Sequence, residues 1–183
     1  MIFSTHTQFV DPATLQQMHQ ELTATPGWVF RKKFWRYYVA NGLVPYNEAD
    51  ESTWYGNQPA IKSVQDPWRT LFDRVQDLAG PNFVLMRYAL TGQTQGQEQE
   101  LHLDTSMNLV GDFRSYLIYL NTEWDNNWGG STEFVVDSKV VHREFPEPGK
   151  LIEFDSQAFH VGHAPNKSEF LRLSLVLHGR LTA

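Results

Sequence analysis

Residues 131–154, with the sequence STEFVVDSKVVHREFPEPGKLIEF, decide the fold. This stretch holds three short runs of β-type residues, at 131–136, 139–143 and 151–154, and the turn dipeptide Pro148-Gly149 precedes the last of them. Four more runs of this kind flank the stretch, at residues 83–90, 98–104, 114–121 and 170–178. Several short strands separated by turn residues are typical of a sandwich, a jelly roll or a barrel. The sequence therefore predicts a β-rich core over residues 82–183.

Two helices are predicted before this core, beginning at Asp11-Pro12 and at Asp66-Pro67 and ending at Pro26-Gly27 and at Gly80-Pro81. The aromatic run 28–38 predicts one strand. The stretch 41–65 predicts a long loop, in which Trp54-Tyr55 could cover a pocket entrance. Because no linker separates these parts, we expect one domain over residues 1–183, with 1–81 as helical support and lid region.

Composition limits the classes of function. The chain has 183 residues, of which 41% are apolar, and carries a formal net charge of −6. Cysteine is absent, which excludes disulfides, thiolate metal sites and a cysteine nucleophile, and a reducing cytoplasm is the expected compartment. The acidic balance argues against nucleic-acid and membrane partners, and no apolar run approaches the roughly 20 residues of a membrane span. The basic and aromatic run 31–38 is therefore interpreted as an ordinary strand.

A candidate metal site begins with the tripeptide His102-Leu103-Asp104. Residues i and i+2 of a strand point to one face, so the imidazole of His102 and the carboxylate of Asp104 should project side by side. His160 is the candidate third ligand, from a neighbouring strand, and His163 is the alternative. Two histidines and one carboxylate on one side of a metal leave three positions open, as in non-haem Fe(II) oxygenases.

Arg172 and Ser174 also share a face, in the β-type run 170–178. A guanidinium binds a carboxylate bidentately, and a hydroxyl can add a further hydrogen bond. The pair could hold the far end of a dicarboxylate whose other end chelates the metal.

Six short motifs follow one another along the chain: His102-x-Asp104, Tyr119-Leu120-Asn121 with Trp124, Gly129-Gly130-Ser131-Thr132-Glu133-Phe134, Pro148-Gly149-Lys150-Leu151-Ile152-Glu153-Phe154, His160 with Pro165, and Arg172-x-Ser174. In this order they resemble the Fe(II)- and 2-oxoglutarate-dependent dioxygenase superfamily, and its prolyl 4-hydroxylase-like branch in particular. The resemblance implies a double-stranded β-helix, a jelly-roll core supported by the N-terminal helices in an α+β chain.

The same resemblance implies that His102, Asp104 and His160 bind iron and form the catalytic centre. It implies Fe(II), 2-oxoglutarate and O₂ as cofactors, with ascorbate as an accessory reductant. The implied reaction hydroxylates a C–H bond of a protein, a peptide such as a prolyl peptide, or a small molecule, while 2-oxoglutarate becomes succinate and CO₂.

The resemblance further implies that Arg172 pairs with the distal carboxylate of 2-oxoglutarate and that Ser174 assists. Tyr119 is expected to share that carboxylate, and Tyr88 is a further candidate contact. Tyr116 and Tyr119 should face opposite ways in a regular strand because their spacing is odd, and we expect Tyr119 to face the pocket.

Alternative functions remain at this point. One is a non-catalytic β-helix module that binds a ligand or a partner, and another is a metal-dependent cupin enzyme that uses no oxoacid. The nucleic-acid dealkylase branch of the superfamily typically carries a second arginine six residues after the cosubstrate arginine, where this chain has His178. The substrate and the oligomeric state are not predicted.

Overall fold

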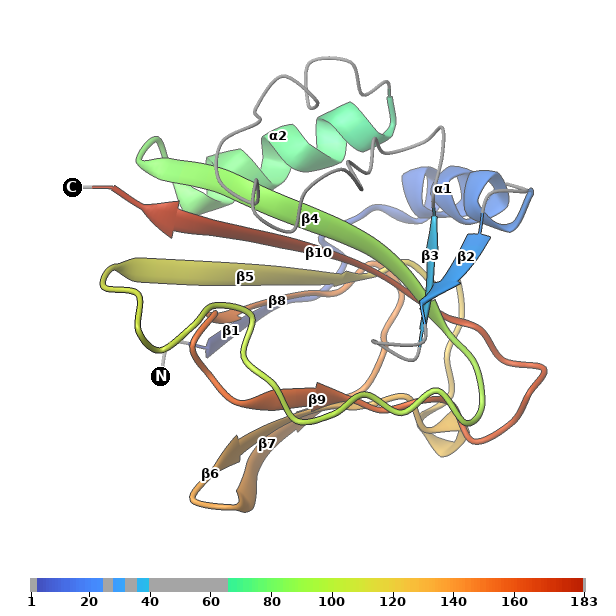
Figure 1. Cartoon of the computed structure of the whole chain (residues 1–183). Helices are drawn as coiled ribbons and strands as arrows, with labels where there is room; N and C mark the ends of the chain where they lie inside the picture. Colours follow the sequence, from blue (N-terminus) through green and yellow to red (C-terminus); the bar gives the residue numbers. More distant parts are fainter. Residues whose placement is uncertain (1–2, 25–27, 32–35, 40–65, 183) are drawn as a thin grey trace.

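The computed structural model describes residues 3–24, 28–31, 36–39 and 66–182. Within these residues the strands form two antiparallel sheets (Figure 1). The major sheet has the order β1-β8-β5-β10-β4-β3-β2 and the minor sheet the order β7-β6-β9. The major-sheet strands are β1 (Phe3–His6), β2 (Trp28–Arg31), β3 (Arg36–Val39), β4 (Phe83–Gln93), β5 (Asp112–Tyr119), β8 (Leu151–Asp155) and β10 (Arg172–Leu181). The minor-sheet strands are β6 (Thr132–Val136), β7 (Lys139–Glu144) and β9 (His160–Gly162).

Two helices, α1 (Pro12–Ala24) and α2 (Trp68–Ala79), lie on the outer side of the major sheet (Figure 1). The carboxylate of Asp11 accepts a hydrogen bond from the backbone nitrogen of Thr14 at 3.0 Å, which caps the start of α1. The helix α2 ends at Gly80, whose φ of +90° few other residues adopt. Both helices bury apolar stripes in a core with the outer face of the sheet; those residues are Leu15, Met18, Leu22, Trp68, Leu71, Phe72 and Val75.

Alternation along the strands divides the major sheet into an outer and an inner face. On β5, Tyr116 and Ile118 belong to the core beneath the helices, whereas Leu117 and Tyr119 belong to a second core that includes Phe134 of the minor sheet. Tyr116 and Tyr119 therefore face opposite ways, as expected from their spacing. The β-rich jelly-roll core with supporting N-terminal helices is confirmed.

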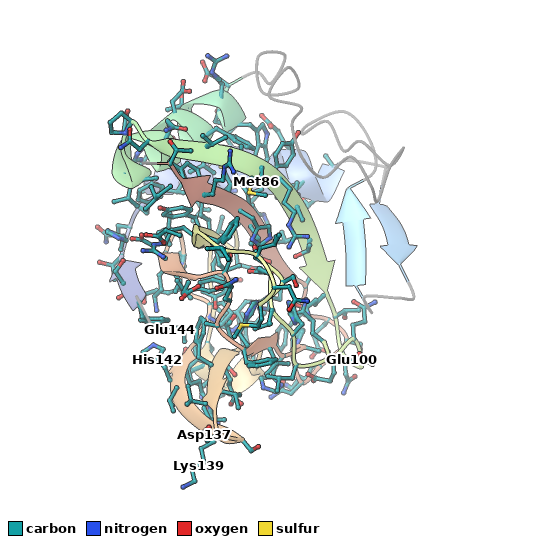
Figure 2. All side chains as sticks on the ribbon, turned by 60° about the vertical axis from the view of Figure 1, so that its left-hand side comes forward. Met86, Glu100, Asp137, Lys139, His142 and Glu144 are labelled. Carbon is teal, nitrogen blue, oxygen red and sulfur yellow. The ribbon has the colours of Figure 1, made fainter. Side chains whose placement is uncertain are left out.

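The minor sheet is small and closes one side of the inner core. Figure 2 shows Asp137 and Lys139 at the tip of the β6–β7 hairpin, with His142 and Glu144 nearer the body of the molecule. A short 3-10 helix, η3 (Asn126–Trp128), lies between β5 and β6. No helix among the described residues is both long and apolar enough to cross a membrane.

Two predictions of elements were wrong, and two strands were not predicted. Residues 98–104 form no strand. A single bridge pair, His102 with His160, joins them to β9. The next backbone nitrogen donor of β9 that faces this segment, that of Gly162, binds the side chain of Gln99 instead of a backbone carbonyl. The run 28–38 holds two strands, β2 and β3, rather than one. The sequence also missed β1 and β9, whose four and three residues give little periodicity to detect.

Part of the sequence-based prediction lies outside the described residues. This applies to the long loop 41–65, to Trp54-Tyr55 as a cover for the pocket, and to residues 32–35 of the basic and aromatic run.

Candidate active site

His102, Asp104 and His160 converge from two segments of the chain. His102 and Asp104 lie in the connection between β4 and β5, and His160 begins β9. The backbones of His102 and His160 exchange two N–H···O hydrogen bonds of 3.0 Å, which set the two rings 4.4 Å apart. The Nε2 atoms of His102 and His160 lie 3.8 and 3.6 Å from the carboxylate oxygens of Asp104. One ligand atom from each residue lies within 4.8 Å of the others, close enough to share one ion.

Backbone carbonyls orient both imidazoles. Nδ1 of His102 lies 2.8 Å from the carbonyl oxygen of Glu100, and Nδ1 of His160 lies 3.0 Å from that of Ala158. Since a carbonyl only accepts hydrogen bonds, each Nδ1 must carry the proton, and the lone pair is left on Nε2. Hydrogen bonds of this kind are the usual way in which proteins prepare histidine as a metal ligand. Figure 2 labels Glu100 on the connection that runs beside the minor sheet.

A buried polar cluster surrounds Asp104. The hydroxyl of Ser115 donates to Oδ2 of Asp104 at 2.8 Å, and Nδ1 of His178 lies 3.3 Å from the same oxygen. Arg87 donates to the backbone carbonyl of Asp104. Burial alone would raise the pKa of Asp104, but the imidazoles of His178 and His160 and the guanidinium of Arg87 outweigh it and hold that pKa well below its ordinary value. The carboxylate is therefore ionised and available to a cation.

Arg172 lies deep in the inner face at the start of β10, with 2% of its surface exposed. Its Nε donates to the carbonyl of Gly130 at 2.8 Å, Nη1 to Oε1 of Gln93 at 2.7 Å, and Nη2 to the hydroxyl of Thr132 at 2.9 Å. These partners come from three parts of the fold and fix the plane of the guanidinium. Sequence reasoning did not single out Gln93, because an isolated glutamine carries no signal.

Ser174 and Tyr119 lie beside Arg172, as the sequence predicted. Nη1 of Arg172 is 3.5 Å from the hydroxyl of Ser174, and its guanidinium carbon is 5.2 Å from the centre of the Tyr119 ring. The hydroxyl of Tyr119 lies 2.8 Å from that of Thr132. Burial raises the pKa of Tyr119, against the opposing effect of Arg172, so the phenol stays neutral and can donate a hydrogen bond.

Two other predicted residues lie elsewhere. Tyr88 packs its ring against Phe72 of α2, with centroids 5.0 Å apart, on the helix-facing side of the major sheet. Neighbouring residues of a strand face opposite sides, so Tyr88 points away from the inner face on which Arg172 lies. The predicted contact of Tyr88 with a cosubstrate does not fit this placement. His163 lies between Glu98 and Glu133, with nitrogen–oxygen distances of 3.1 and 3.2 Å, and it is not part of the three-residue cluster. His160, rather than His163, completes that cluster.

Comparison with known proteins identifies the family. The model of the 2OG-Fe(II) oxygenase superfamily matches residues 83–178 of the chain. The chain belongs to this superfamily. No curated protein matches the sequence.

Solved structures resemble this oxygenase in fold. A prolyl-4-hydroxylase from Pseudomonas putida shares 16% identity at a TM-score of 0.61, covering 99% of this chain and 93% of its own. A prolyl hydroxylase from Trichoplax adhaerens, solved with a peptide of the hypoxia inducible factor oxygen degradation domain, shares 18% identity at 0.58, covering 97% and 83%. A 2OG-Fe(II) oxygenase family oxidoreductase from Burkholderia pseudomallei shares 17% identity at 0.60, covering 97% and 84%.

The family implies Fe(II), 2-oxoglutarate and O₂, and the residues of this oxygenase fit them. Two imidazole Nε2 atoms and one ionised carboxylate are a donor set suited to Fe(II). Arg172 supplies a buried, fixed guanidinium suited to a carboxylate on the same inner face. The accessory role of ascorbate stays a prediction.

Proposed function

We propose that this oxygenase hydroxylates a C–H bond of a peptide, protein or small-molecule substrate and converts 2-oxoglutarate to succinate and CO₂. The observation that carries the proposal is the His102, Asp104 and His160 cluster, with both Nε2 atoms directed at one ionised carboxylate. We assign these three residues as the iron ligands. Bound Fe(II) supplies the redox chemistry that couples O₂ and 2-oxoglutarate to oxidation of the substrate.

We assign Arg172 to the distal carboxylate of 2-oxoglutarate, with Ser174 and Tyr119 as assisting donors. A buried guanidinium without an anion is costly, and a carboxylate in this position would offset its desolvation. The hydrogen bonds that Arg172 donates to Gly130 and Thr132 orient the guanidinium before the ligand arrives, so little side-chain entropy is lost on binding.

A peptide is the substrate class that we favour. Leu101 and Phe159 each precede a proposed iron ligand in the chain, and both are exposed large apolar side chains. Met107 lies exposed in the same connection as Asp104. Apolar side chains around a metal centre suit a substrate that presents apolar residues, and the similar structures include prolyl hydroxylases.

We further propose that residues 1–183 form one oxygenase domain. Residues of α1 and α2 share one apolar core with β4, β5 and β10, which supports joint folding of the two helices with the jelly roll. The predicted cytoplasmic location is part of this proposal.

An anaerobic titration tests the proposed function. Purified protein loaded with Fe(II) should develop a weak visible charge-transfer band when 2-oxoglutarate is added, and admission of O₂ with peptide mixtures should yield succinate and a peptide heavier by one oxygen. A metal-loaded protein that gives neither band nor succinate would instead be a binding module or another metal-dependent cupin.

A further inference from the structure

The amide nitrogen of Gln99 is buried and has no hydrogen-bond partner in the described part of the chain. In the described part of the chain two buried side-chain nitrogens lack a hydrogen-bond partner, Nε2 of Gln99 and Nε2 of His163. The second has a carboxylate oxygen of Glu133 at 3.2 Å and is therefore not isolated. Burial of an amide donor without an acceptor is unfavourable, so Nε2 of Gln99 calls for an acceptor that binds from outside the chain.

The orientation of the Gln99 amide is fixed by its other atom. Oε1 accepts a hydrogen bond of 2.9 Å from the backbone nitrogen of Gly162. A flipped amide would set an NH₂ against that N–H, so the assignment of nitrogen and oxygen follows from the hydrogen bond.

The Gln99 amide lies against the inner face of β9. A Cβ atom on Gly162 would come within 2.5 Å of Oε1, so the amide occupies the space that a side chain at this position would fill. His160 lies two residues earlier on the same strand and shares this face. Gln99 thus lies on the side of β9 that carries a proposed iron ligand.

Two sets of hydrogen bonds link Gly162 to Arg172. The carbonyl of Gly162 accepts from Nε2 of Gln93 at 3.1 Å, and Oε1 of Gln93 accepts from Nη1 of Arg172 at 2.7 Å. Gly162 also pairs across the minor sheet with Thr132, whose hydroxyl accepts from Nη2 of Arg172. The strand position that binds the Gln99 amide is therefore linked by hydrogen bonds to the guanidinium of Arg172, and the same strand carries His160.

We propose that Nε2 of Gln99 donates a hydrogen bond to a carboxylate oxygen of 2-oxoglutarate. Gln99 is then a further cosubstrate-binding residue, held in place by Gly162. The inference rests on the proposed function, because it requires that the diacid bind between Arg172 and the metal.

The test is calorimetric titration of 2-oxoglutarate into anaerobic protein loaded with Mn(II), a metal that supports binding without turnover. Gln99→Glu keeps an acceptor oxygen for the backbone nitrogen of Gly162 but replaces the donor with a negative charge, and Gln99→Met removes both the donor and that acceptor. We expect roughly 10- to 100-fold weaker binding for Gln99→Met and a larger loss for Gln99→Glu, with unchanged Mn(II) affinity. The matched control is Gln95→Glu, an exposed glutamine of the same connection whose amide donates to the carbonyl of Asn166.

The outcomes separate the two proposals. Arg172→Gln should also weaken 2-oxoglutarate binding, and if it does not, the proposed function fails whatever Gln99 does. If Arg172→Gln weakens binding while both Gln99 variants bind as tightly as the parent, the role of Gln99 is overturned. A parallel loss of Mn(II) affinity in Gln99→Met would also overturn it, because that loss reports a structural effect on the segment that carries His102.

Discussion

His160 and His163 are three residues apart, and this odd spacing decides their chemistry. His160 faces the inner core, where its ring contacts Phe134 and Phe154 with centroids 5.8 and 4.9 Å away. His163 follows the end of β9 and lies between the exposed carboxylate of Glu98 and the largely buried carboxylate of Glu133. Residues an odd number apart on extended backbone face opposite sides, so only one of the two histidines can reach Asp104.

This difference predicts the behaviour of histidine variants. His160→Ala should abolish Mn(II) binding and succinate formation, because it removes one of three ligands. His163→Ala, the matched control, should keep both within about twofold, a change well below 1 kcal/mol. Calorimetry with Mn(II) and a succinate assay measure these properties, and loss of metal binding in His163→Ala with retention in His160→Ala would reverse the assignment.

Asp104 gives a second test at the residue scale. Asp104→Ala and His102→Ala should each eliminate succinate formation while circular dichroism shows a folded protein. Normal turnover in either variant would refute the assignment of the iron ligands.

Tyr88 predicts an effect of alkaline pH on stability. Burial raises the pKa of Tyr88 to about 12, above the value of 10.0 for a free tyrosine. A group whose pKa is higher in the folded state stabilises it below the unfolded pKa, and this contribution is lost as the pH rises from 10 towards 12. Urea unfolding should therefore show stability falling over this range, with a shallower fall in Tyr88→Phe.

The control for the Tyr88 prediction is cosubstrate binding. Tyr88→Phe should bind 2-oxoglutarate as the parent does, because Tyr88 faces α2. Tyr119→Phe should bind it more weakly, because the Tyr119 hydroxyl is lost beside Arg172. An identical slope of stability against pH in the parent and Tyr88→Phe would contradict the first prediction.

At the scale of elements, the turn into β6 holds Arg172, the residue proposed to bind the cosubstrate. Gly130 has a φ of +75°, and its carbonyl accepts the hydrogen bond from Nε of Arg172. A Cβ there would come within 2.7 Å of the Trp124 ring and 3.3 Å of the Arg172 side chain. Trp124 donates from its indole nitrogen to the carbonyl of Gly129, which keeps its ring against this turn. The turn and the Trp124 ring thus restrict the position of the Arg172 side chain.

Gly130→Ala should therefore destabilise the protein and weaken 2-oxoglutarate binding. The matched control is Gly96→Ala, where φ is +82° but nothing lies within 4 Å of the added carbon. Both variants carry the cost of left-handed backbone, so the additional loss in Gly130→Ala, expected to be about 1–3 kcal/mol, isolates the steric contact. Urea unfolding and calorimetry with 2-oxoglutarate measure the two effects, and equal losses in both variants would contradict this reasoning.

The strands of the core were predictable where alternation or apolar content is strong. Residues 83–90, 114–121 and 170–178 read as strands because long β-type runs have few other interpretations, and β4, β5 and β10 confirm them. The segment 98–104 carries a similar pattern but is held by the amide of Gln99 and a single bridge pair. Local sequence cannot reveal such partners, since Gly162 is more than sixty residues away.

The clustering of the proposed metal ligands was predictable for a different reason. The order of the motifs along the chain is informative, and these motifs contain His102, Asp104, His160 and Arg172. The strand predicted to carry His102 and Asp104, however, is not formed. The residues around them, Ser115, His178 and Gln93, belong to no motif. Their roles depend on which strands are neighbours, and that is a property of the folded sheet.

At the scale of the whole molecule, the proposed metal joins separate parts of the fold. Its ligands come from the connection after β4 and from β9 of the minor sheet, and Ser115 of the major sheet holds Asp104. A ligand that binds only the folded state stabilises it by an amount that grows with the logarithm of its concentration. The thermal midpoint should therefore rise with Mn(II) concentration, by about 2.7 kcal/mol in unfolding free energy at 100 times the dissociation constant.

Asp104→Ala is the control for this stabilisation, and its midpoint should not respond to Mn(II). A midpoint that rises equally in both proteins would show that the metal acts elsewhere.

The central strand β10 has a consequence for the ligands that this protein can accept. Every second residue of the strand lies on its inner face, and these residues are Arg172, Ser174, Val176 and His178. Each step of two residues advances about 6.6 Å. Removal of a single residue from the strand would turn the guanidinium towards the outer face of the sheet, into the apolar core beneath the helices. Moving the guanidinium along the inner face while keeping its direction therefore requires a shift of two residues, which corresponds to about 6.6 Å.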